Sequence, residues 1–185
     1  MGIPYDLPLG TYNEIEINKD KIPLLNKAKR NEDFLDLDDF INQMLKLHND
    51  ERKKNKSIEL KINEALNLLA CEYAEKLILY QGKIKYRHFM YNIYNGLILG
   101  ENIAFSETKE PKKIFDYWLK ERKNYKTNNK KFSKENAHYT QIIWKNTKEI
   151  GISISHDKEN KRYCTVILYY PPGNVLGGFP DNVLS

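Results

Sequence analysis

The chain has 185 residues, of which 41% are hydrophobic and 12% aromatic. This size and apolar content suit one packed core and give no reason to expect two. No segment approaches the roughly 18 consecutive apolar residues of a membrane span, and the first residues lack the basic and apolar regions of a signal peptide. Composition therefore predicts a protein without a membrane span, built around a single core.

Charge separates the first 39 residues from the rest of the chain. Residues 1–39 hold nine acidic and five basic residues, a net charge of −4, whereas residues 40–185 hold sixteen acidic and twenty-five basic residues, a net charge of +9. The first segment also contains three prolines and few aromatic residues, a composition typical of a partly extended arm. We therefore predict an N-terminal extension over residues 1–39 and one domain over residues 40–185.

The spacing of apolar residues predicts three helices in the first part of the domain. The first begins near Asp38 or Asp39, either of which is a candidate N-cap. The second follows Asn63, another candidate N-cap, and ends at Gly82. The third begins around Pro111, because a proline in the first turn loses no helical hydrogen bond.

The second part of the domain reads as a loop, a short helix and two strands. The basic and Asn-rich residues 120–134 are predicted to form a loop, and residues 139–144 a short helix. Alternating apolar residues over 150–155 indicate a half-buried strand, followed by a polar turn at 156–160. The continuous apolar run 163–170 indicates a central strand covered on both faces. Helices first and strands last predict an α+β layered domain.

Two cysteines, Cys71 and Cys164, are too few for a disulfide framework. Each is flanked by apolar residues, so we predict two buried free thiols. The shortage of cysteines favours an intracellular or peripheral membrane protein; a secreted protein whose signal peptide has been removed is the alternative. In that second case the glycosylation sequon at Asn55 would matter.

Two short segments carry the most specific signals in the chain. Residues 138–147 read His-Tyr-Thr-Gln-Ile-Ile-Trp-Lys-Asn-Thr, and residues 169–175 read Tyr-Tyr-Pro-Pro-Gly-Asn-Val. Further landmarks occur in a fixed order along residues 40–185: His48-Asn49, His88, Gly100-Glu101-Asn102, Trp118 and Glu121. Together these residues resemble the CAP superfamily, which groups cysteine-rich secretory proteins, insect venom antigens and plant pathogenesis-related type 1 proteins. The shortage of cysteines favours its intracellular, Golgi-associated branch.

The resemblance implies both a fold and a site. The implied fold is a three-layer α-β-α sandwich with a central antiparallel sheet. The implied site is a cleft tetrad of His88, Glu101, Glu121 and His138. Spacing alone does not assemble the tetrad, and without the resemblance each histidine reads as an ordinary solvated or hydrogen-bonded residue. Two carboxylates beside two imidazoles would fix the ring tautomers, and the neutral nitrogens would bind Zn²⁺ or another divalent cation.

Most other residues of the landmarks read as structural. We interpret Trp144 as a core anchor and His48 as a packed helix histidine. Asn102 is expected to hold the loop that carries Glu101, and Asn174 to satisfy backbone groups in its own turn. His156, in the polar turn, is expected to be solvated.

The basic residues between 120 and 134 suggest a surface property. Seven Lys or Arg residues oppose one acidic residue there. Such a segment is either simply solvated or attracted to anionic lipid headgroups. We do not expect nucleic acid as a partner, because no binding motif accompanies the charge.

The leading hypothesis is a non-enzymatic CAP domain that binds lipid or sterol and associates with an anionic membrane surface, a protein partner or a second copy of itself. Its cleft would hold a divalent metal. One alternative is a metal-dependent hydrolase, a protease or esterase, that uses the His/Glu tetrad. The chain has neither a Gly-x-Ser-x-Gly elbow nor a His-Glu-x-x-His helix, and we therefore favour no catalysis. The other alternative is a protein-interaction module with a vestigial cleft.

Overall fold

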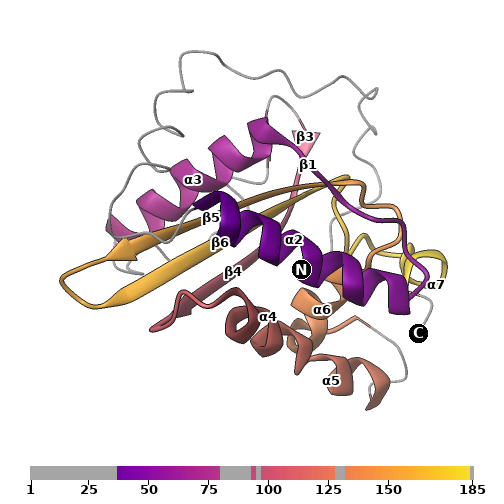
Figure 1. The fold of residues 1–185 in the computed structure, drawn as a ribbon. Helices are drawn as coiled ribbons and strands as arrows, with labels where there is room; N and C mark the ends of the chain where they lie inside the picture. Colours follow the sequence, from indigo (N-terminus) through magenta and orange to yellow (C-terminus); the bar gives the residue numbers. More distant parts are fainter. Residues whose placement is uncertain (1–36, 80–92, 95–96, 128–131, 184–185) are drawn as a thin grey trace.

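A computed structural model describes residues 37–79, 93–94, 97–127 and 132–183 (Figure 1). The predicted extension over residues 1–39 lies almost entirely outside the described residues. No helix in the described part is long and apolar enough to cross a membrane. The elements in chain order are α2 (Leu37–Lys54), β1 (Lys61–Ile62), α3 (Glu64–Leu79), β2 (Ile93–Tyr94), β3 (Leu97–Ile98), β4 (Gly100–Ser106), α4 (Pro111–Leu119), α5 (Arg122–Thr127), the 3₁₀ turn η2 (Lys134–Asn136), α6 (Ala137–Ile143), β5 (Glu149–Asp157), β6 (Arg162–Tyr170) and α7 (Phe179–Asn182).

The main sheet has four strands in the order β1-β5-β6-β4. Strands β5 and β6 form an antiparallel hairpin, in register from Glu149 opposite Tyr170 to Asp157 opposite Arg162. Strand β4 runs antiparallel along the other edge of β6, whereas the two-residue β1 pairs with β5 in parallel. The predicted antiparallel sheet is therefore confirmed for its three long strands, and β1 makes the sheet mixed.

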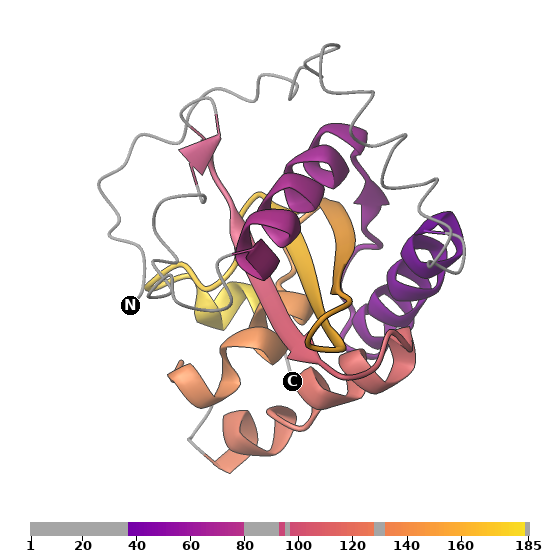
Figure 2. The ribbon, with the colours of Figure 1, turned by 90° about the vertical axis from the view of Figure 1, so that its left-hand side faces the viewer.

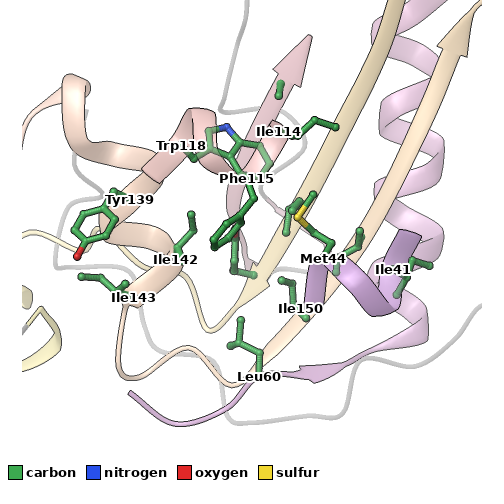
Figure 3. Close-up of a cluster of buried hydrophobic side chains, with 14 of the residues drawn as sticks. Ile41, Met44, Leu60, Ile114, Phe115, Trp118, Tyr139, Ile142, Ile143 and Ile150 are labelled. Carbon is green, nitrogen blue, oxygen red and sulfur yellow. The ribbon is translucent and has the colours of Figure 1, made fainter. Parts of the chain in front are cut away.

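Helices cover both faces of this sheet. Helix α3 packs on one face against β5 and β6, while α2, α4 and α6 cover the other face (Figures 1 and 2). The larger core lies under α2, α4 and α6, where Met44, Phe115 and Trp118 are buried together with isoleucines of the sheet and of α6 (Figure 3). This arrangement confirms the three-layer α-β-α sandwich.

Strand β5 differs from its prediction. The alternation of isoleucine with small residues predicts a strand with one face in water, yet Gly151 and Ser153 are buried as well. The reason is the close approach of α3: a Cβ on Gly151 would overlap Leu66 of that helix. Asn67 of α3 also accepts a hydrogen bond of 2.8 Å from the main-chain N–H of Ile152. The small residues thus leave room for a helix rather than facing solvent.

Two of the predicted helix starts are confirmed. The side-chain oxygen of Asn63 accepts hydrogen bonds from the N–H groups of Ala65 and Leu66, at 2.9 and 3.2 Å, and so caps α3. Pro111 is the first residue of α4. Asp38 and Asp39 instead lie inside the first turn of α2, so neither is its N-cap. Gly82, the predicted end of α3, is outside the described residues.

The segment 120–134 is not the continuous loop that its composition predicts. Residues Arg122–Thr127 form helix α5, and Tyr125 in that helix is only 1% exposed. Its ring lies 6.4 Å from that of Tyr139 in α6, so burial of an aromatic side chain outweighs the weak helix propensity of the segment. The predicted helix 139–144 is confirmed, with observed bounds Ala137–Ile143.

Candidate functional site

The best-defined polar pair at the predicted site is His138 with Glu121. His138 is the second residue of α6, and Glu121 lies in the turn between α4 and α5. The Nδ1 atom of His138 is 2.6 Å from Oε1 of Glu121, and the two side chains are 30% and 16% exposed. A carboxylate only accepts hydrogen bonds, so Nδ1 carries the proton. In the neutral ring Nε2 therefore has a lone pair available for a ligand.

Glu121 also holds the start of α6. Its second oxygen accepts hydrogen bonds from the N–H groups of His138 and Tyr139, at 2.9 and 3.2 Å. The first N–H groups of a helix have no partner within the helix, and a negative charge there is favourable. One carboxylate thus fixes both the backbone and the ring of His138.

Trp118 fixes the His138 ring from one side. The two rings are nearly parallel, at 21°, with centroids 6.0 Å apart. Trp118 is completely buried in the core under α4 (Figure 3). Glu121 therefore orients the imidazole ring through a hydrogen bond, and the buried Trp118 ring packs against one side of it.

The other two residues of the predicted tetrad are placed differently. His88 lies outside the described residues. Glu101 is half-buried in strand β4, not in a loop as expected, and it pairs across the sheet with Leu168. Successive strand residues point to opposite faces, so Glu101 projects away from the face that Asn102 presents to α6. The structure brings Glu121 and His138 together, and in its described part no three His, Cys, Asp or Glu residues are grouped to hold a metal ion.

The sequence suggested that Asn102 holds the segment that carries Glu101, but the hydrogen bonds of Asn102 go to other segments. Its side-chain nitrogen donates hydrogen bonds to the main-chain oxygen of His138 at 3.2 Å and to the hydroxyl of Tyr169 at 3.1 Å. Asn174 also bonds beyond its own turn: it donates to the carbonyl of Ala137 and accepts from the hydroxyl of Thr140, at 2.9 and 2.6 Å. Both asparagines therefore tie distant segments to α6.

His48 is a packed helix histidine, as predicted. Its Nδ1 lies 2.7 Å from the carbonyl of Met44 and its Nε2 2.9 Å from the hydroxyl of Tyr169. Burial lowers the pKa of His48 from 6.5 to about 4, and the positive charge of Arg52 adds to this effect. His48 is therefore neutral at physiological pH.

Two further predictions can be compared with the structure. Trp144 is 2% exposed and meets Phe179 edge-to-face with centroids 4.9 Å apart, which confirms it as a core anchor. His156 is not freely solvated: it is half-buried, and its ring stacks on Tyr163 at a centroid distance of 4.4 Å. Cross-strand pairing in the hairpin places these two rings together.

Sequence reasoning missed Arg52, the largest buried charged side chain among the described residues. It is 0% exposed and donates hydrogen bonds to four main-chain carbonyls, those of Ile58, Ile142, Trp144 and Thr147. A signal was present, because Arg52 follows Met44 and His48 at four-residue intervals and so continues their buried face of α2.

The sequon asparagine is also buried. Asn55 is 7% exposed, and its side-chain nitrogen donates to the carbonyl of Glu51 at 2.9 Å. Its side-chain oxygen accepts from the hydroxyl of Tyr139 at 3.3 Å. The side chain that glycosylation would modify is therefore engaged within the fold.

The basic surface is only partly described. Lys120, Arg122, Lys123 and Lys134 are exposed, and Tyr117 on the adjoining α4 is 61% exposed. Arg122 lies 3.8 Å from the buried carboxylate of Glu51, which links α5 to α2. We call Tyr117 and these four basic residues the α4–α5 surface.

Comparison with known proteins gives one consistent result. The CAP family, described as the cysteine-rich secretory protein family, matches residues 45–169. The chain is 32% identical over 148 residues to the human Golgi-associated plant pathogenesis-related protein 1, covering 78% of this chain and 92% of that protein. It is 29% identical over 147 residues to PRY2 of Saccharomyces cerevisiae, covering 79% of this chain but 41% of the yeast protein.

Solved structures show the same fold. Venom allergen-like protein 4 of Schistosoma mansoni superposes with a TM-score of 0.56 at 25% identity, covering 71% of this chain and 87% of that one. A crystal structure of NaASP2 with Zn²⁺ superposes with a TM-score of 0.53 at 18% identity, covering 74% and 81% of the two chains. From the sandwich fold and the family match over residues 45–169, the chain belongs to the CAP, or cysteine-rich secretory protein, family.

Proposed function

We propose that this CAP domain is a non-catalytic binding module that holds a divalent metal ion, Zn²⁺ in the first instance, through Nε2 of His138. The observation that carries the proposal is the 2.6 Å hydrogen bond between Nδ1 of His138 and Glu121. Histidines that bind metals commonly donate their other ring N–H to a carboxylate, which fixes the tautomer and makes the free nitrogen more basic. His138 has this arrangement.

In the proposed site the tetrad residues would have different roles. Both oxygens of Glu121 accept hydrogen bonds from His138 or Tyr139, so Glu121 would orient the ligand rather than coordinate the metal. Glu101 lies on the opposite face of β4 from α6, so His88 is the remaining candidate ligand beside His138, and water would complete the coordination. A bound Zn²⁺ would supply a Lewis-acid centre with room for an oxygen ligand. Support for this metal also comes from NaASP2, a relative in fold that was crystallised with Zn²⁺.

Thermal unfolding with and without zinc tests the metal site. Zn²⁺ should raise the melting temperature, because a ligand present at 100 times its Kd stabilises the folded state by about 2.7 kcal/mol. His138→Ala should abolish the shift, whereas His156→Ala, a matched change in the β5–β6 hairpin, should keep it. The shift should shrink at acidic pH because protons compete for the ring nitrogens.

Two results would reject this function. If zinc leaves the wild-type melting temperature unchanged at neutral pH, the metal site is wrong and a pure interaction module remains. If the wild type hydrolyses peptides or esters in a metal-dependent way and Glu121→Gln or Glu101→Gln abolishes turnover, the protein is the hydrolase of the alternative hypothesis.

We further propose that the α4–α5 surface binds anionic membranes. The proposed ligand of the domain itself is a sterol or another lipid. Each basic residue near such a membrane contributes about 1 kcal/mol, and an exposed tyrosine suits the headgroup region. The double variant Lys120→Glu/Lys123→Glu should lose most co-sedimentation with phosphatidylserine vesicles. The control Lys46→Glu, on α2 with a side chain 74% exposed, should not. Equal binding to neutral and anionic vesicles would reject the electrostatic attachment.

A further inference from the structure

A buried chain of hydrogen bonds joins α2 to the first turn of α6. It runs from the carbonyl of Met44 to Nδ1 of His48 at 2.7 Å, and from Nε2 of His48 to the hydroxyl of Tyr169 at 2.9 Å. It continues from that hydroxyl to the side-chain nitrogen of Asn102 at 3.1 Å, and from there to the carbonyl of His138 at 3.2 Å. Its residues come from α2, β6, β4 and α6, which are distant in sequence.

The direction of every hydrogen bond in this chain is fixed. A carbonyl only accepts, so Nδ1 of His48 donates to Met44, and in the neutral ring Nε2 then accepts. Tyr169 must therefore donate to His48, and its oxygen accepts from Asn102. The amide of Asn102 cannot be flipped, because its oxygen would then face the carbonyl oxygen of His138. The hydrogen-bond chain therefore runs in one direction, and no reversed arrangement satisfies the same groups.

The side chains that form the hydrogen-bond chain are buried and shielded from water. His48 and Tyr169 are 0% exposed and Asn102 is 1% exposed. Phe115 covers His48, with ring centroids 4.9 Å apart. Where water is excluded, breaking one of these hydrogen bonds leaves a buried polar group without a partner. The hydrogen-bond chain therefore resists rearrangement.

We propose that Asn102, held by Tyr169 and His48, is a positioning residue for His138. Glu121 fixes the N–H and the ring of His138, and Asn102 fixes its carbonyl, so the residue is held on both sides of its Cα. A small rotation of the main chain there would move Nε2 and weaken the bond to Glu121. The inference rests on the proposed metal site for its consequence, but the positioning itself is a property of the protein without metal.

Two variants and two matched controls test this role. Asn102→Ala removes the contact with His138, and Tyr169→Phe removes only the hydroxyl that holds Asn102. Asn67→Ala removes an asparagine that is as buried as Asn102 but bonds to the backbone of β5. Tyr125→Phe alters a buried tyrosine that does not belong to the hydrogen-bond chain. Because Tyr169→Phe keeps the shape of the side chain, it serves if Asn102→Ala does not fold.

The readout without metal is the pair of imidazole ¹⁵N shifts of His138 at pH 8, assigned by their loss in His138→Gln. In the wild type and both controls these shifts should report a single Nδ1–H tautomer. In Asn102→Ala and Tyr169→Phe they should move towards a mixture of tautomers. Shifts unchanged from the wild type in both variants would overturn the positioning role.

Zinc titration calorimetry supplies the second readout. The two variants should raise the Kd for Zn²⁺ about tenfold, as is typical when a supporting group is lost, while the controls keep the wild-type value. If the ¹⁵N shifts respond but the wild type does not bind zinc, the metal function fails and the positioning stands. If the controls weaken zinc as much as the variants, the effect is general destabilisation and the proposal is wrong.

Discussion

Arg52 donates a hydrogen bond of 2.8 Å to the main-chain carbonyl of Trp144, entirely within the protein interior. Three more carbonyls, those of Ile58, Ile142 and Thr147, accept from the same guanidinium. Burial lowers the pKa of Arg52 to about 10, so the group stays charged at neutral pH. The last carbonyls of a helix carry partial negative charge, and a cation at the end of α6 stabilises them.

Replacing Arg52 with methionine should therefore destabilise the fold strongly. Methionine is similar in length but cannot donate a hydrogen bond. The carbonyls of Ile58, Ile142 and Thr147 lose this donor, whereas that of Trp144 keeps the N–H of Thr147, and we expect the free energy of unfolding to fall by about 4 kcal/mol. Arg52→Lys should lose less, because an ammonium group still donates to some of these oxygens. Urea unfolding at pH 7 measures both variants. Arg52→Met as stable as the wild type would show that the carbonyls find other donors.

His48 should make stability depend on pH between about 6.5 and 4. Its pKa is 6.5 when unfolded and about 4 when folded, so only the unfolded state takes up a proton in this window. The contribution to stability is complete above the unfolded pKa and is lost as the pH falls towards the folded pKa. Between pH 7 and pH 5 the free energy of unfolding should fall by about 2 kcal/mol from this group alone.

Urea unfolding of the wild type and His48→Gln at both pH values isolates this contribution. The variant should lose about 2 kcal/mol less than the wild type on acidification, whatever its stability at pH 7. Equal losses in the two proteins would mean that His48 titrates alike in the folded and unfolded states.

The two thiols should be unreactive in the folded protein. Burial is the main cause that raises the pKa of Cys71 to about 11 and that of Cys164 to about 12. Both are buried and unpaired with each other, which confirms the predicted free thiols. Ellman's reagent at pH 8 should label neither in native protein and both in guanidinium chloride, because only the thiolate reacts. Rapid labelling of the native state would indicate local opening between α3 and the sheet.

Gly151 should not tolerate a side chain. In Gly151→Ala the new Cβ would overlap the backbone of Leu66, so α3 must move away from β5, at a cost of about 1–3 kcal/mol. Ser153→Ala changes the next residue on the same face of β5 and only removes a hydroxyl, so it should stay close to the wild type. Thermal unfolding compares the two. An unchanged melting temperature for Gly151→Ala would show that the helix adapts without strain.

The sequence predicted the elements whose signals are local. The cap at Asn63, the start of α4 at Pro111 and the buried strand β6 each follow from residues adjacent in the chain. The landmark motifs identified the family and therefore the sandwich. Predictions from local residues were wrong where a distant element buries a segment. Strand β5 was predicted to be half-exposed because the sequence does not show that α3 packs on it. Helix α5 was predicted to be a loop because the sequence does not show that Tyr125 packs against Tyr139 of α6.

The sequence, through its resemblance to the CAP family, determined that this chain is an α+β CAP domain with His88, Glu101, Glu121 and His138 as site candidates. Only the tertiary structure decided what these residues do to each other. Hydrogen bonds act over about 3 Å, and sequence spacing does not show which side chains come that close. The 2.6 Å contact of Glu121 with His138, and the chain from Met44 to His138 through Asn102, exist because α2, α4, α6 and the sheet pack around one core.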